Sequence, residues 1–166
     1  ILLTSGGVSM GMRDLIKPIL EALGTVHFGR VAIKPGKPLT FATAGQAYIL
    51  GLPGNPVSSL VMFEMVVRPL MRLLGGHRAI HRPRVWARLK HTVRHEPARL
   101  EFQRARLTFT EGTWWAETTG AQISSRLLSL AGANALLCIP RGVGNLEAGT
   151  EVEAIRLDLP ETEAMG

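Results

Sequence analysis

The chain has 166 residues, of which 46% are apolar, enough for one domain or two small ones with a buried core. No apolar run reaches the roughly 18 residues of a membrane-spanning helix, and the first residues lack the features of a signal peptide. A single cysteine, Cys138, excludes an internal disulfide and fits the reducing conditions of the cytoplasm.

The net charge of +6 is distributed unevenly along the chain. Residues 1–76 carry seven Lys and Arg against three acids, and residues 77–166 carry twelve against ten. There is no run of about five like charges, and the few aromatic residues do not alternate with basic ones, so a nucleic-acid partner is not indicated. We expect a basic pocket for an acidic small molecule, with a generally basic surface as the alternative.

Strand-like and helix-like segments alternate over residues 1–76. The i, i+3, i+4 spacing of apolar residues predicts a helix over Asp14–Leu23, which Gly24 is placed to end. A second helix is expected over Val57–Leu74, bent near its far end by Pro69. The expected strands cover residues 1–4, 26–33, 39–42 and 47–52, with a hairpin-like link at 43–46. This order predicts a parallel α/β sheet whose ligands bind beyond the carboxyl ends of the strands.

The period changes after Gly75-Gly76 and a polar stretch that we interpret as a linker over residues 77–82. Beyond this linker, only Ser124–Ala131 has a helical pattern. Short strands are expected at Val85–Val93, Leu100–Thr110, Thr113–Thr118, Ala135–Ile139 and Glu151–Leu157, with turns at Glu111-Gly112, Arg141-Gly142 and Ala148-Gly149. The sequence therefore predicts an α/β domain over residues 1–76 and a small, mostly β domain over 83–166, either a barrel or a compact sheet.

The segment Lys34-Pro35-Gly36-Lys37-Pro38 places two ammonium groups on one short turn. Each proline fixes its own φ and restricts the residue before it, so Lys34 and Lys37 have little entropy left to lose on binding. Such a turn suits a small oxyanion or a phosphate. A plain surface turn between two strands is the alternative.

A loop rich in glycine and serine, Thr4-Ser5-Gly6-Gly7-Val8-Ser9, follows the first strand. Its glycines allow a ligand to approach the backbone, and its N–H groups are suited to cradle phosphate. It is neither a Rossmann fingerprint nor a P-loop, and an ordinary tight turn is the alternative. Asp14, just beyond it, suits a Mg²⁺ ion held with substrate phosphates, or it stabilises the start of the helix.

The segment Pro53-Gly54-Asn55-Pro56 leads into the second helix. Asn55 suits the N-cap and Pro56 the first helical position, where its missing N–H costs nothing. Ser58 falls in the first turn, where a hydroxyl and the helix N-terminus together suit an anion. Pure capping is the alternative, and one geometry allows both uses.

In the β domain, Arg104 and Arg106 alternate with other residues and are predicted to share one side of a strand. They suit bidentate contact with an oxyanion, or they belong to a solvated face. Ser124 is either a helix N-cap or a ligand donor. The five histidines form no zinc pattern with Cys138, which lies in an apolar strand and is interpreted as a core residue rather than a nucleophile.

Taken in order, these segments resemble one family, the molybdopterin molybdenumtransferases, which includes bacterial MoeA, the E domain of the plant enzyme and the E domain of gephyrin. The matching segments are TSGGVSMG (4–11), Asp14 with Lys17, AIKPGKP (32–38), GLPGNPVS (51–58), RLEFQR (99–104) and TGAQISS (119–125).

The resemblance implies insertion of molybdate into adenylated molybdopterin, with release of AMP and help from Mg²⁺ or another divalent cation. It gives molybdate-binding positions to Lys34, Lys37, Pro38, Ser58, Arg104 and Ser124, and it makes Asp14 a metal-associated carboxylate that acts in catalysis with the two lysines. The other substrate-binding positions are Ser5, Gly6, Gly7, Ser9, Pro53, Asn55 and Pro56. A tetrahedral dianion suits ammonium, guanidinium and hydroxyl donors that converge, here expected in a cleft between the two domains.

Members of this family extend far beyond Ile1 on the N-terminal side, so we expect a C-terminal fragment that is inactive alone. Residues 1–76 would then be the second half of a three-layer molybdopterin-binding α/β domain. The missing stretch would hold the other half of that domain, a second metal carboxylate and the domains that build a homodimer. The implied donor of the pterin is a molybdopterin adenylyltransferase. Met12 replaces an acidic residue of many relatives, and Arg30 replaces a lysine of some. The alternatives are a non-catalytic scaffold on the same fold and a pterin-adenylating relative, against which the β domain argues.

Overall fold

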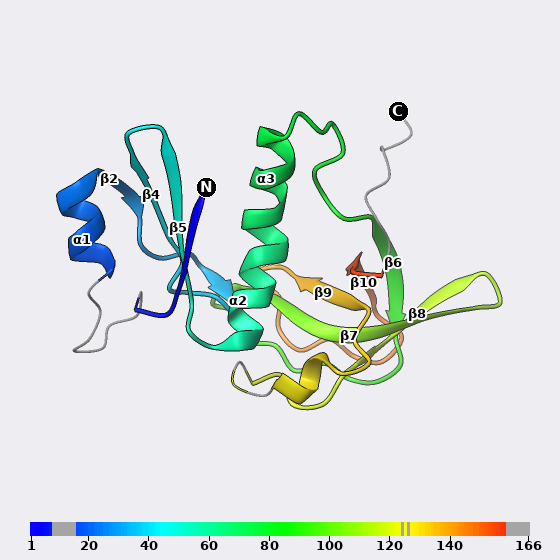
Figure 1. Cartoon of the computed structure of the whole chain (residues 1–166). Coiled ribbons are helices and arrows are strands. Elements are labelled where there is room, and N and C mark those ends of the chain that lie inside the picture. The colour runs from blue at the N-terminus through cyan, green and yellow to red at the C-terminus, as the bar shows by residue number, and fades with distance from the viewer. Residues whose placement is uncertain (8–15, 124, 126, 159–166) are drawn as a thin grey trace. The chain divides into compact units, whose positions relative to one another are not determined.

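The computed structural model of the chain describes residues 1–7, 16–123, 125 and 127–158. The chain divides at Gly76 into two compact units, Ile1–Gly76 and His77–Gly166 (Figure 1). Over the described ranges, no helix is both long enough and apolar enough to cross a membrane.

The first unit is built on a four-stranded sheet in the order β1-β5-β4-β2. These strands are β1 (Leu2–Ser5), β2 (Thr25–Phe28), β4 (Thr40–Ala44) and β5 (Ala47–Leu52), and a separate short strand, β3, covers Ile33–Lys34. β1 runs parallel to β5, as predicted, whereas β4 is antiparallel to both β5 and β2. The sheet is therefore mixed, and the predicted hairpin-like link is a turn at Gly45-Gln46.

The expectation of one strand over residues 26–33 is wrong. β2 ends at Phe28, after its register against β4 shifts between Val26 and Phe28, and the chain bends at Gly29. Glycine has no side chain to pack against a sheet and often marks such an irregularity. The chain then forms β3 as an element of its own.

Helix α1 (Ile16–Leu23) turns one apolar side toward the sheet, where Leu20 packs against Ala42 and Ile49. The prediction that Gly24 ends this helix is confirmed, because its N–H donates to the carbonyl of Leu20 at 2.9 Å. A Cβ atom at Gly24 would lie 2.0 Å from the carbonyl oxygen of Thr43. The close approach of β4 therefore requires a glycine here.

The predicted second helix is confirmed as a continuous helical segment over residues 56–74. It consists of α2 (Pro56–Met62), a π-helical turn η1 (Phe63–Val67) and α3 (Arg68–Leu74). Pro69 cannot donate a hydrogen bond, and its ring collides with a carbonyl four residues earlier in an ideal α-helix. The wider π turn directly before it relieves this conflict.

The second unit is a closed five-stranded β barrel. Its strands are β6 (Arg84–Leu89), β7 (Leu100–Thr110), β8 (Thr113–Thr118), β9 (Ala135–Ile139) and β10 (Glu151–Arg156). They follow the order β7-β8-β6-β10-β9, and β9 pairs with β7 to close the barrel. The predicted bounds of β7, β8 and β9 are confirmed. β6 ends earlier than predicted, and Val93 forms only an isolated bridge with Leu146.

Small and large apolar side chains share the interior of this barrel, as its taper requires. They are Ala87, Leu89, Ala105, Leu107, Ala116, Leu137, Ile139, Val152 and Ala154. The predicted turn at Glu111-Gly112 is confirmed, with both residues at positive φ. In place of the predicted helix over 124–131, the described residues form a short 3₁₀ helix, η2 (Leu127–Leu130).

Candidate functional site

In the first unit, two loops meet where β1 and β5 end. The two strands run parallel with Ser5 opposite Leu52, so both of their carboxyl ends lie at one edge of the sheet. The N–H of Gly6 donates to the carbonyl of Leu52 at 3.0 Å, and a Cβ atom at Gly54 would lie 3.4 Å from the Cα of Gly6. Gly6 and Gly7 have φ of +80° and +69°. The two loops thus present bare backbone at the edge where open α/β sheets bind ligands.

The start of α2 lies directly after this edge. Asn55 occupies the N-cap position and Pro56 the first helical position, as predicted, but the Asn55 side chain makes no capping hydrogen bond. Ser58 is 4% exposed in the first turn. The hydroxyl of Ser59 donates to the carbonyl of Pro53, which ties the loop to the helix. The Asn55 side chain therefore does not cap α2.

The lysine turn over residues 34–38 is packed into the first unit rather than lying loosely on its surface. Pro35 and Gly36 are buried, Lys34 is half-buried and Lys37 is exposed. The N–H of Val31 donates to the carbonyl of Lys37 at 3.0 Å. Gly36 has φ of +125°, and a Cβ atom there would lie 2.6 Å from the Met62 side chain. The peptide bond between Lys34 and Pro35 is cis, which the sequence did not indicate.

In the second unit, Arg104 and Arg106 share the outer side of β7, as predicted, because Ala105 and Leu107 between and beyond them point into the barrel core. Their surroundings differ. Arg106 is exposed, whereas Arg104 is 1% exposed and is the largest of the fully buried side chains. The solvated face that was the alternative therefore holds for Arg106 and is wrong for Arg104.

The segment after β8 covers Arg104 and binds it. The guanidinium donates from Nε and Nη2 to the Ser129 hydroxyl at 3.1 and 2.9 Å, and from Nη2 to the carbonyls of Ala121 and Ile123 at 3.1 and 3.4 Å. The Gln122 side chain accepts from the backbone N–H of Arg104 and donates to its carbonyl. Burial lowers the pKa of Arg104, and the negative charge of Glu101 opposes this shift.

Comparison with known proteins gives a consistent result for both units. Residues 1–73 match the family described as "Probable molybdopterin binding domain", and residues 86–157 match the "MoeA C-terminal region (domain IV)". The chain is 43% identical to gephyrin of Dictyostelium discoideum over 93% of its length, and 36% identical to the molybdopterin molybdenumtransferase of Haemophilus influenzae over 92%. A crystal structure of the MoeA protein of Pyrococcus horikoshii covers 95% of the chain at 32% identity, with a TM-score of 0.72.

The chain belongs to the MoeA and gephyrin family. This is a family of molybdenum cofactor biosynthesis proteins, and the resemblance that the sequence motifs carry is thereby confirmed. The chain spans 25% of the length of the gephyrin relative, 38% of the Haemophilus enzyme and 37% of the Pyrococcus structure.

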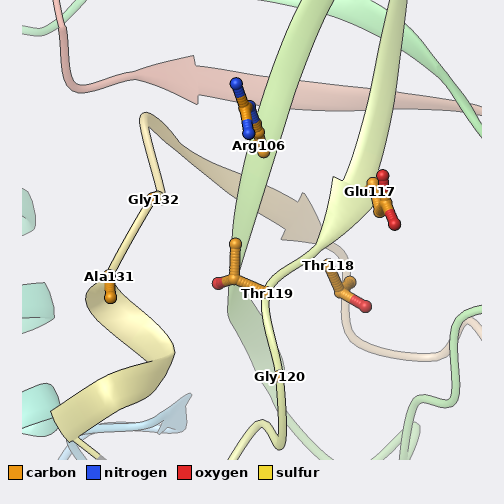
Figure 2. A pocket seen from close by; sticks show the side chains of 7 residues that line it. All are labelled: Arg106, Glu117, Thr118, Thr119, Gly120, Ala131 and Gly132. Atoms are coloured by element: carbon orange, nitrogen blue, oxygen red, sulfur yellow. The ribbon is translucent and has the colours of Figure 1, made fainter.

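A hollow of about 350 Å³ lies beside the segment that covers Arg104 in this MoeA-like barrel. Figure 2 shows its lining, with Arg106 on β7, Glu117 on β8 and Gly132 after η2. Arg106 and Glu117 are directly opposite in the β7–β8 register, but the carboxylate of Glu117 lies 3.9 Å from Lys90 Nζ. Arg106 makes no ion pair within the described residues, and it provides a control for Arg104 on the same strand face.

Three of the predicted site residues, Ser9, Asp14 and Ser124, lie outside the described residues. Among the residues that are described, no three His, Cys, Asp or Glu side chains gather where a metal ion could be held. The Mg²⁺ prediction concerns Asp14 and stays a prediction. Cys138 is half-buried, and burial followed by the charge of Glu153 raises the pKa of its thiol, which agrees with a packing role.

Sequence reasoning missed the roles of three residues of the Arg104 network, Ser129, Thr119 and Gln122. Ser129 is 4% exposed and its hydroxyl accepts two of the four guanidinium hydrogen bonds, and Thr119 donates from its hydroxyl to the Ser129 carbonyl at 2.5 Å. Gln122 lies in a segment that matches the family, but the sequence predicts no role for it. A serine and a threonine at these positions have no local pattern that distinguishes them from surface residues. Only their contacts identify them, that of Ser129 with Arg104 across 25 residues and that of Thr119 with Ser129 across 10.

Proposed function

We propose that the protein carrying this chain inserts molybdate into adenylated molybdopterin, with release of AMP and of molybdenum cofactor. The observation that carries this proposal is the meeting of the Gly6-Gly7 and Pro53-Gly54 loops at the paired carboxyl ends of β1 and β5. Backbone without side chains at such an edge allows the phosphate groups of a pterin nucleotide to approach closely. The match of this unit to a molybdopterin-binding family supports the same substrate class.

In this proposal, Lys34 and Lys37 bind the molybdate dianion and neutralise its charge. The stiff turn that carries them supports the assignment, because buried Pro35 and Gly36 hold the backbone while Lys37 stays exposed. Two ammonium groups on a preorganised turn lose little entropy on binding a compact anion. Pro38 and Ser58 complete the set proposed for the first unit, and the other proposed contacts are Ser5, Gly6, Gly7, Ser9, Pro53, Asn55 and Pro56.

From the second unit we propose Arg104 and Ser124 as molybdate-binding residues. The guanidinium of Arg104 is buried, and its hydrogen bonds within the described residues go to neutral oxygens. Its positive charge therefore remains available to a dianion.

The remaining parts of the proposal rest on the family resemblance. They are an Mg²⁺ ion held by Asp14, a homodimer of the complete protein, a molybdopterin adenylyltransferase as the donor, and a cytoplasmic location. A cation would offset phosphate charge and assist release of AMP, and we derive no step through it. We also propose domain bounds of 1–76 and 83–166, joined by a linker over 77–82.

The test is synthesis of molybdenum cofactor by the complete natural protein from pterin-adenylate, molybdate and Mg²⁺. We expect Lys34→Ala and Arg104→Ala each to lower product formation at limiting molybdate by about tenfold or more, because each removes a charge-assisted contact. Arg106→Ala is the matched control and should retain the activity. Unchanged product formation in both Lys34→Ala and Arg104→Ala would show that these residues do not form the site.

A further inference from the structure

The guanidinium of Arg104 is held by neutral groups only. Its four hydrogen bonds within the described residues go to the Ser129 hydroxyl, which accepts two, and to the carbonyls of Ala121 and Ile123. No ion pair joins it to a carboxylate of the described part of the chain. Buried arginines are usually paired with an acid, because an uncompensated charge is costly away from water. The barrel thus maintains a buried cation that forms no ion pair among these residues, and the negative charge of Glu101 acts on it only through electrostatics.

The Ser129 hydroxyl determines how this cation is oriented. It accepts from Nε at 3.1 Å and from Nη2 at 2.9 Å, so one oxygen binds one edge of the planar group. Nη2 also donates to the carbonyls of Ala121 and Ile123. Only Nη1 makes no hydrogen bond within the described residues. Two contacts on one edge fix the plane of a rigid guanidinium, and the opposite Nη1 side is left for another acceptor.

Ser129 is itself fixed from two sides. It lies in η2 and is 4% exposed, and its carbonyl accepts the Thr119 hydroxyl at 2.5 Å. Thr119 in turn donates from its backbone N–H to the carbonyl of Arg104 at 3.0 Å. These hydrogen bonds form a closed loop. It runs from the Arg104 backbone on β7 through Thr119 to Ser129 on η2, and from Ser129 back to the Arg104 guanidinium. A closed network of this kind holds a side chain more firmly than separate contacts do.

We propose that Ser129 is a positioning residue for oxyanion binding: its hydroxyl holds the Nε–Nη2 edge of Arg104 so that Nη1 is presented to molybdate. This inference rests on the proposed function. Ser129 does not touch the substrate, and it acts through Arg104. A hydroxyl serves this purpose better than a carboxylate, because it orients the guanidinium without neutralising the charge that a dianion needs.

The experiment uses the complete natural protein and measures kcat and KM for molybdate separately. We expect Ser129→Ala to raise KM about tenfold and to change kcat less than about threefold, because ground-state binding is lost while the chemistry is retained. Ser129→Thr keeps the hydroxyl and should restore KM to within about threefold of the wild type. A role in folding alone would lower the active fraction, and hence kcat, without moving KM, and that result would overturn the inference.

Thr119→Val provides a second variant that keeps the guanidinium partners and removes only the bond to the Ser129 carbonyl. We expect it to raise KM for molybdate about threefold. If the folded variants at residues 119 and 129 have the KM of the wild type while Arg104→Ala raises it, the inference is overturned and the proposed function stands. A wild-type protein that forms no molybdate-dependent product overturns the proposed function and the inference with it.

Discussion

The lysine turn of the first unit and the Arg104 region of the second present positive charge in different ways. Lys34 and Lys37 belong to a five-residue turn whose prolines and glycine determine its backbone, and Lys37 remains exposed. Arg104 is 1% exposed and owes its orientation to Ser129, Ala121 and Ile123, far along the chain. The charge of Lys37 is therefore locally organised and hydrated, whereas the charge of Arg104 is organised by tertiary contacts and desolvated. The two regions should respond differently to mutation and to salt.

The largest effect is expected from Arg104→Ala on the stability of the protein. The change leaves a cavity and removes the donors of four hydrogen bonds, so we expect unfolding free energy to fall by about 3 kcal/mol. Urea denaturation followed by tryptophan fluorescence measures it. Arg106→Ala, on the same strand face, should change stability by less than about 0.5 kcal/mol. Equal effects of the two substitutions would show that the buried hydrogen bonds of Arg104 do not stabilise the barrel.

Gly36→Ala is the next test, and it probes whether the lysine turn is as rigid as its packing indicates. Gly36 combines φ of +125° with a Cβ position 2.6 Å from Met62, so we expect a loss of about 2 kcal/mol. Gly45→Ala is the control, because Gly45 has φ of +55° but no atom within 4 Å of its Cβ position, and about 1 kcal/mol is expected. If urea denaturation gives equal losses of unfolding free energy for the two variants, the contact with Met62 adds nothing to the cost of Gly36→Ala.

Salt provides a third comparison, through binding of molybdate to the complete protein by calorimetry. An exposed ammonium is screened more strongly than a buried guanidinium. The affinity of the wild type should therefore fall as sodium chloride is raised, and Lys37→Ala should show a shallower fall than Arg104→Ala. Parallel salt dependences in the two variants would contradict a difference in solvation between the turn and the barrel.

The smallest effect is expected for the stability of Lys37→Ala. Lys37 is exposed, so unfolding free energy should change by less than about 0.5 kcal/mol. Molybdate binding by the same variant should weaken by at least about fivefold, since the proposed contact is lost. A stability loss comparable to that of Arg104→Ala would mean that the lysine supports the fold rather than the ligand.

The sequence predicts best those parts of the molecule that depend on nearby residues. The bounds of β7, β8 and β9 follow from short runs of apolar and strand-forming residues, alternating only in part, between clear turn signals. The break after Phe28 is not predicted, because it depends on a register shift against β4. The antiparallel placement of β2 beside β4 likewise depends on strands that are distant in the chain, which no local pattern encodes.

In the candidate site too, the locally determined parts are predicted and the parts that depend on distant residues are not. The lysine turn and the position of Asn55 at the helix start are visible in the sequence, because proline, glycine and a capping residue specify them locally. The burial of Arg104 cannot be predicted from the sequence. Alternation along β7 predicts on which side of the strand Arg104 lies, but it does not predict which segment covers that side. Ser129 escapes prediction for the same reason. Its importance comes from contact with a residue 25 positions away.

The contact between Gly6 and Gly54 has a consequence for protein engineering. The two loops are 48 positions apart in the sequence, yet Gly6 is hydrogen-bonded to Leu52 and its Cα would lie 3.4 Å from a Cβ at Gly54. Neither loop can therefore be transplanted from a relative on its own unless the incoming segment keeps the glycine. Chimeras that exchange residues 5–7 and 53–55 together preserve this fit, and those that exchange one loop with a bulkier residue force the strand ends apart.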